Sequence, residues 1–102
     1  MQFDKSLRSL AIVSMAVVAP IALQASAPAP HYVAELVRPT SESQAIAGGV
    51  MFRCEGTRCT GPRSGHRPLR VCSQLQREVG EIASFRAGDE ALSAERLEAC
   101  NG

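Results

Sequence analysis

The sequence predicts an α+β fold: a small disulfide-stapled domain in which short antiparallel strands are covered by two helices, preceded by a cleaved signal peptide. Several segments rich in β-forming residues and one segment with helical periodicity are separated by glycines and prolines. Every one of these segments is short. A chain of 102 residues has room for one domain at most. An even number of cysteines follows the leader: Cys54, Cys59, Cys72 and Cys100.

Residues 1–27 are predicted to be the signal peptide. Lys5 and Arg8 precede an apolar run from Leu10 to Leu23, and Ala25-Ser26-Ala27 then offers the small residues of a cleavage site. Cleavage two residues earlier is an alternative. As a helix the run would span about 21 Å, short of the about 30 Å of a membrane core, and Pro20 interrupts it, so a stable membrane span is not expected. The predicted location is periplasmic or secreted.

Residues 28–44 are interpreted as an extended leader with the first strand, and residues 45–102 as the disulfide-stabilised core. The first strand is expected at residues 31–37, which are rich in β-formers and are followed by Pro39. Residues 45–54 are interpreted as a single second strand, with Gly48-Gly49 inside it as a bulge or bend. Phe52 and Cys54 share one face of that strand, which should point inward.

A loop rich in glycine and proline leads to the first helix, which Pro68 opens and Gly80 ends. Apolar residues recur along one stripe of this helix: Val71, Cys72, Leu75 and Val79. Residues 81–92 are expected to form a strand and a short hairpin whose turn is Ala87-Gly88-Asp89. Ser93 caps the second helix, and Glu95 lies in its first turn.

The cysteines favour two disulfides, because an exported chain with an even number of cysteines oxidises them in pairs. The preferred pairing is Cys54–Cys59, across a tight reversal at Gly56, with Cys72–Cys100 joining the helices. Cys54–Cys100 with Cys59–Cys72 is the next choice. A zinc site with His66 is disfavoured because only one close cysteine pair exists, and the four-residue spacing argues against a redox dithiol.

The segments FRC…C, RPLRVC and VGEIASFRAGDEALSAERLEACN form an ordered pattern, Cys-x4-Cys … Pro-x3-Cys … Phe-x2-Gly … Cys-Asn. This pattern resembles a family of small exported alphaproteobacterial proteins of uncharacterised function. The resemblance covers residues 50–101, with Phe52 where that family has tryptophan. It implies export and disulfides, and it implies no reaction. The matching positions are Phe52, Cys54, Cys59, Pro68, Cys72, Gly80, Phe85, Gly88, Leu92, Leu97, Cys100 and Asn101.

Charge is distributed unevenly along the chain. Residues 56–77 contain no acid, while residues 78–102 contain six acids against two arginines. Guanidinium groups bind phosphate and carboxylate in pairs, so the basic segment is a candidate surface for an anionic envelope component or a periplasmic protein. The favoured interpretation is that the two charged halves face each other or are both solvated, and the anion-binding surface is the other candidate. The candidate anion-facing residues are Arg58, Arg63, Arg67 and Arg70, with Arg77 in the same segment.

No catalytic motif is present in the sequence. The serines have no G-x-S-x-G context, no glycine-rich phosphate loop is found, and the only candidate histidine bases are His31 and His66. Nucleic acid is not an expected partner, because no aromatic residue is interleaved with the arginines and the charge after cleavage is near zero. The prediction is a non-enzymatic exported protein without a cofactor or metal. The alternative is a small periplasmic metal-binding protein or enzyme that uses His66 and the cysteines.

Overall fold

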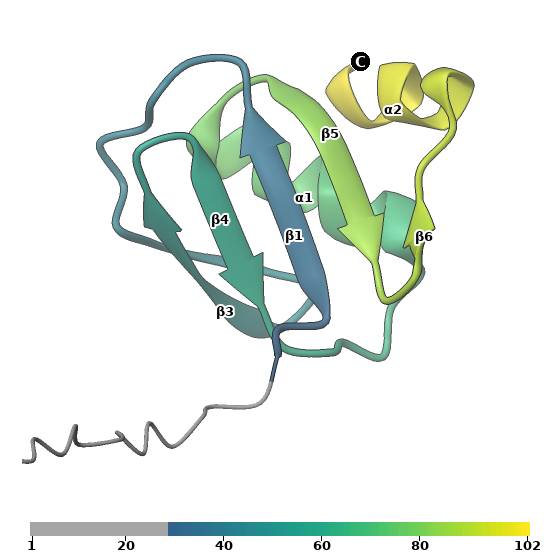
Figure 1. The fold of residues 1–102 in the computed structure, drawn as a ribbon, viewed down its shortest axis with the longest axis horizontal. Coiled ribbons are helices and arrows are strands. Elements are labelled where there is room, and N and C mark those ends of the chain that lie inside the picture. The colour runs from purple at the N-terminus through teal and green to yellow at the C-terminus, as the bar shows by residue number, and fades with distance from the viewer. Residues whose placement is uncertain (1–28) are drawn as a thin grey trace, which may run out of the picture.

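The structure, a computed structural model, describes residues 29–102 as an antiparallel sheet with two helices on one of its faces (Figure 1). The predicted signal peptide lies outside the described residues. The helices are α1 (Pro68–Val79) and α2 (Ala94–Asn101). The strands are β1 (Tyr32–Leu36), β2 (Gln44–Ala47), β3 (Val50–Glu55), β4 (Arg58–Gly61), β5 (Ile82–Ala87) and β6 (Glu90–Ala91). The predicted α+β class is confirmed.

The six strands of this sheet lie in the order β2-β3-β4-β1-β5-β6. The chain leaves β1, forms the β2-β3-β4 meander, and returns so that β4 pairs with β1. It then crosses the sheet through α1 and adds β5 on the other side of β1. The first strand therefore belongs to the interior of the sheet. Its residues Tyr32, Ala34 and Leu36 are buried, so β1 contributes to the same core as the strands that follow residue 44.

The segment from Ala45 to Cys54 is a hairpin, and the prediction of one bulged strand was wrong. β2 and β3 pair antiparallel, with Ala47 opposite Val50. Gly48 and Gly49 have φ angles of 62° and 76°, so both lie in the left-handed region that a two-residue hairpin turn of this kind requires. Two consecutive glycines thus reverse the chain where one would have made a bulge.

Three aromatic rings form the centre of the core. Tyr32 of β1 stacks against Phe52 of β3 and Phe85 of β5, with ring centroids 5.8 and 5.5 Å apart. Because β4 separates β3 from β1, the Phe52 ring lies over Gly61 of β4. A Cβ at Gly61 would be 3.0 Å from that ring. The absence of a side chain at Gly61 is therefore what allows the rings of Phe52 and Tyr32 to meet.

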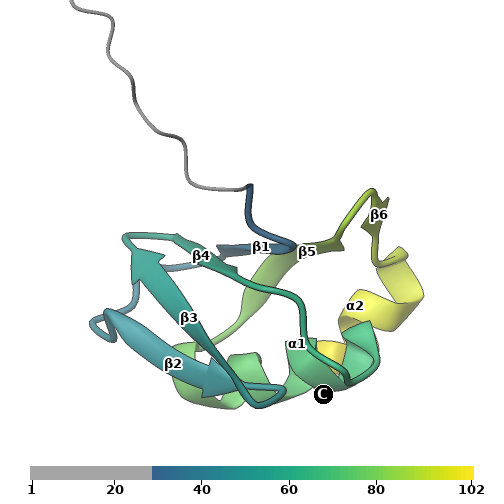
Figure 2. The same ribbon diagram turned by 90° about the horizontal axis from the view of Figure 1, so that it is seen from below.

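α1 buries the predicted apolar stripe against this core, and Pro68 and Gly80 bound it as expected. Seen from below, β2 and β3 bend toward α1, so the sheet wraps around the helix (Figure 2). α2 packs beside α1 and against β5. Its Ser93 cap is also confirmed, since the Ser93 hydroxyl accepts a hydrogen bond from the Arg96 N–H at 3.2 Å. None of the helices between residues 29 and 102 is long and apolar enough to cross a membrane.

Candidate functional site

Two disulfides join the elements that surround the core. Cys54 and Cys59 are directly opposite on β3 and β4, with their Cα atoms 4.0 Å apart. Cys72 of α1 is linked to Cys100 of α2 across a Cα separation of 5.6 Å. This is the pairing that the sequence favoured. The second link holds the two helices side by side, and the candidate site lies along those helices.

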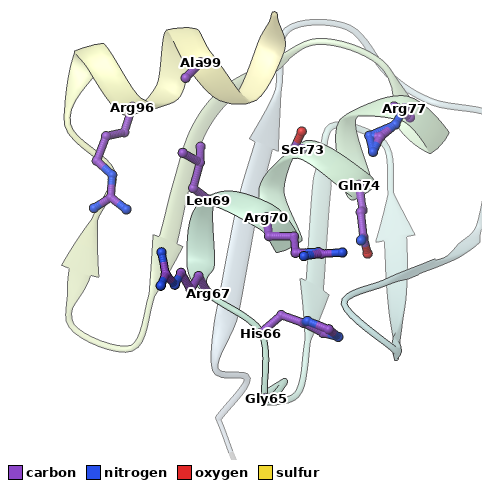
Figure 3. Close-up of a pocket in the computed structure, with 10 residues that line it drawn as sticks. All are labelled: Gly65, His66, Arg67, Leu69, Arg70, Ser73, Gln74, Arg77, Arg96 and Ala99. Atoms are coloured by element: carbon purple, nitrogen blue, oxygen red, sulfur yellow. The ribbon is translucent and has the colours of Figure 1, made fainter.

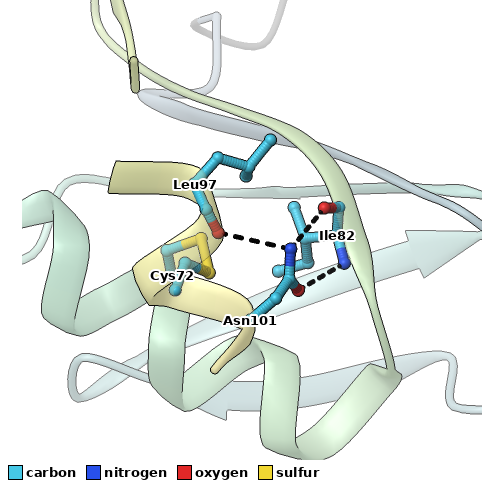
Figure 4. Close-up of a disulfide and its surroundings, with 5 residues drawn as sticks. Cys72, Ile82, Leu97 and Asn101 are labelled. Carbon is cyan, nitrogen blue, oxygen red and sulfur yellow. Dashed lines mark hydrogen bonds between the residues drawn. A yellow bond between two sulfur atoms is a disulfide. The ribbon is translucent and has the colours of Figure 1, made fainter. Parts of the chain in front are cut away.

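Asn101 fastens the other side of α2 to the sheet (Figure 4). Its side-chain oxygen accepts a hydrogen bond from the N–H of Ile82, the first residue of β5, at 2.9 Å. Its amide group donates to the Ile82 carbonyl at 2.8 Å and to the Leu97 carbonyl at 3.3 Å. Asn101 thus satisfies both backbone groups of one strand residue. The Cys-Asn ending of the sequence pattern therefore holds α2 in place through a disulfide and a carboxamide.

An open groove of about 750 Å³ runs over the solvent-facing sides of α1 and α2 (Figure 3). Its lining contains four arginines and no carboxylate: Arg67, Arg70, Arg77 and Arg96. The uncharged polar side chains of Ser73 and Gln74 lie among them, and Leu69 and Ala99 supply the apolar part. We call this surface the basic groove.

The groove forms because α1 is amphipathic. Arg70, Gln74 and Arg77 follow one another at helical spacing on the side roughly opposite the buried stripe. Arg96 joins them from α2, which the disulfide holds alongside. The four arginines of the groove are exposed, and none forms an ion pair with an acid of residues 29–102.

Gln74 is held in place by the β2–β3 turn. The N–H of Gly48 donates to the Gln74 side-chain oxygen at 2.6 Å. The oxygen of this carboxamide is therefore engaged, and its NH₂ group makes no hydrogen bond to another residue of the described chain. As Gln74 lines the groove, it has both donors of its NH₂ group left there, beside the second lone pair of the engaged oxygen.

Ser64 fixes the loop that brings His66 and Arg67 to the groove. Ser64 is the one buried residue of polar or charged type in the described part of the chain, at 9% exposure. The Ser64 hydroxyl donates to the Gly48 carbonyl at 2.6 Å and accepts from the His66 N–H at 3.0 Å. The Ser64 N–H donates to the Tyr32 hydroxyl at 3.3 Å. The loop, the hairpin turn and the aromatic core are thereby connected through one residue.

The structure separates the four arginines that the sequence proposed as anion-facing. Arg67 and Arg70 lie in the basic groove. Arg58 is on the sheet face that points away from the helices, and its guanidinium is 3.4 Å from the Glu35 carboxylate. Arg63 lines a different hollow, beside Arg53 and the start of β1.

Among the polar side chains of the groove, sequence reasoning missed Ser73, Gln74 and Arg96. Gln74 lies three and four residues from Arg77 and Arg70, so a helical wheel of α1 would have included it. Arg96 had no such signal, because its place depends on how α2 docks on α1.

The cysteines and His66 do not form the metal or redox site of the alternative hypothesis. All four cysteines are in disulfides, so no thiolate is left to act as a ligand or nucleophile. No group of three or more His, Cys, Asp and Glu side chains with the proximity of metal ligands occurs within residues 29–102. His66 instead lines the basic groove with the arginines.

The fold and the groove define a small two-disulfide α+β domain with a basic surface on its helical side. The chain belongs to a family of unknown function, DUF8200, which matches residues 12–102. Comparison with curated proteins and comparison with solved structures found no match.

Proposed function

We propose that this protein is a non-enzymatic, exported binding or accessory module whose basic groove holds anionic groups of an envelope component or of a periplasmic protein. The observation that carries the proposal is the composition of the groove. Four guanidinium groups from two helices line it, and no carboxylate does. Arginine presents its N–H groups as a rigid fork that matches phosphate and carboxylate oxygens.

The compartment follows from the sulfur chemistry and from the leader. Two disulfides indicate an oxidising compartment outside the cytoplasm. The signal-like residues 1–27 and the resemblance to small exported alphaproteobacterial proteins support the periplasm or the medium as that compartment. Anionic groups are plentiful in a bacterial envelope, so a ligand of this charge fits the proposed location.

Binding in the groove should be moderate in strength and sensitive to salt. The arginines are exposed, and exposed charge pairs contribute about 0.2–1 kcal/mol each. Their interactions weaken when the Debye length shrinks from about 10 Å at 0.1 M salt to about 3 Å at 1 M. Several such contacts acting together are needed for useful affinity, and the groove offers four.

The test compares two double variants with the same change in net charge. Arg67→Gln with Arg70→Gln removes two guanidinium groups from the groove. Arg53→Gln with Arg86→Gln removes two from strands β3 and β5 outside it. On a phosphate-bearing resin, the wild type and the β-strand variant should elute at the same salt concentration, and the groove variant should elute earlier.

Equal early elution of both variants would mean that net charge alone governs retention, and it would contradict the proposal. Circular dichroism and thermal melting of all three proteins provide the folding control. The substituted side chains are exposed, so each melting temperature should stay close to that of the wild type.

A further inference from the structure

Resting on the proposed anion-binding function, we propose that the basic groove binds an extended chain of linked phosphate groups rather than a single anion or an acidic glycan. Three features of the groove favour such a ligand: the length of the arginine row, the donors that line it and the fixed position of Gln74.

The arginines are spread too far apart for one small anion. Arg67, the N-cap residue of α1, and Arg77, in its last turn, are ten residues apart, which corresponds to about 15 Å at the helical rise of 1.5 Å per residue. Figure 3 shows Arg77 toward one end of the groove and Arg67 with Arg96 toward the other. A single phosphate at either end leaves the guanidinium at the opposite end unused. A ligand with repeated charges contacts the whole row.

The lining offers hydrogen-bond donors and almost no acceptors. Its charged side chains are guanidinium groups, which donate only, and no carboxylate or phenylalanine, tyrosine or tryptophan ring is among its residues. Phosphate oxygens are acceptors, so every contact they make in the groove can be a charge-assisted hydrogen bond. A glycan would bring hydroxyl donors that find few acceptors. A nucleic-acid strand would find no phenylalanine, tyrosine or tryptophan ring on which its bases stack, since His66 is the one aromatic ring in the lining.

Gln74 continues the row of donors between the arginines. It lies four residues after Arg70 and three before Arg77, on the same side of α1. Because the Gly48 N–H occupies its oxygen, the carboxamide has its NH₂ group left for a ligand. The middle of the row therefore donates as well, and the line of donors from Arg70 to Arg77 is continuous.

The experiment measures affinity as a function of ligand length. Orthophosphate, tripolyphosphate and long-chain polyphosphate are titrated into the oxidised protein at constant low salt. Affinity should rise at least about tenfold from orthophosphate to the long chain, because anchors on one chain bind cooperatively. Arg77→Gln should weaken long-chain binding by about fivefold and leave orthophosphate binding at the Arg67 end within about twofold. Arg86→Gln, on the sheet, should change neither.

Three results would overturn the inference while leaving anion binding intact. The first is equal affinity for orthophosphate and the long chain, which would indicate a single-anion site. The second is a carboxylate glycan of similar length, such as polygalacturonate, binding as tightly as polyphosphate. The third is single-stranded DNA doing so. If the wild type bound no anion at all, the proposed function itself would fail.

Discussion

At the scale of single residues, Asn101 joins the end of α2 to the sheet. Two of its three side-chain hydrogen bonds hold α2 against Ile82, the first residue of β5, and the third goes to the Leu97 carbonyl within α2. Replacing Asn101 with alanine leaves the N–H and the C=O of Ile82 without these partners. Unsatisfied groups of this kind cost about 1–3 kcal/mol, so we expect the free energy of unfolding to fall by that amount.

Urea denaturation of the oxidised protein measures this loss. Gln44→Ala is the matched control, because Gln44 is an exposed amide side chain on β2 that makes no side-chain hydrogen bond within residues 29–102. An equal, small effect of both substitutions would show that the Asn101 contacts do not stabilise the fold.

Gly48 and Gly49 provide a matched pair for a second prediction. Both have positive φ, so alanine at either position costs about 1–2 kcal/mol in backbone conformation. A Cβ at Gly48 would also lie 2.7 Å from the Val71 side chain and 2.8 Å from the Ser64 hydroxyl, whereas a Cβ at Gly49 meets nothing within 4 Å.

We therefore expect Gly48→Ala to destabilise the protein by about 1–3 kcal/mol more than Gly49→Ala, the usual cost of overpacking a core. The difference between their midpoints of chemical denaturation measures it. Identical midpoints would indicate that the turn moves away from α1 without cost. Gly48→Ala should also weaken polyphosphate binding, because the same turn holds Gln74.

At the scale of elements, α1 packs against the core on one side and lines the basic groove on the other. We expect the two disulfides to contribute unequally to the stability of the domain that holds it. Crosslinking removes more entropy from the unfolded chain when the closed loop is longer. The Cys54–Cys59 link spans five residues of sequence separation and the Cys72–Cys100 link spans 28. In the chain-entropy model these loops correspond to about 2 and about 3.5 kcal/mol.

Paired serine substitutions test this ranking. Cys72→Ser with Cys100→Ser should lower the melting temperature more than Cys54→Ser with Cys59→Ser. In a domain with a total stability of about 4–8 kcal/mol, the first variant should lie close to unfolding. It should also lose polyphosphate affinity, since Arg96 reaches the groove only when α2 is docked on α1. The opposite order of melting temperatures would contradict the argument from loop length.

At the scale of the whole molecule, the disulfides offset a small interior. A chain of this size buries only about 60% of the surface that it exposes when unfolded, and its largest fully buried side chains are Tyr32, Phe52 and Phe85. Protein purified after export should contain no free thiol, and its mass should correspond to a start after Ala27 or Ala25. Reduction should lower its melting temperature.

Thiol labelling measures the number of free thiols, and intact mass measures the position at which the mature chain starts. A chain beginning at Met1 with reactive cysteines would refute export.

Local sequence determined much of this protein. The ends of α1, its buried stripe, the Ser93 cap, the turns at Gly56 and Gly88 and the preferred disulfide pairing could all be predicted. All but the Cys72–Cys100 link, which spans 28 residues, depend on residues close together in the chain: a proline or glycine that restricts one backbone position, or apolar residues at one helical period. Such patterns can be interpreted even when the positions of distant segments are unknown.

Tertiary structure alone decided the rest. Nothing near β1 indicates that it lies between β4 and β5, and only that arrangement shows why Gly61 must lack a side chain under Phe52. The basic groove is likewise a product of packing, because Arg67 and Arg70 meet Arg96 where α2 is docked on α1 and linked to it by a disulfide, while Arg58 lies on the opposite face. The sequence shows how many charged residues each segment has. Where those charges lie on the surface depends on the directions in which the strands and helices point their side chains.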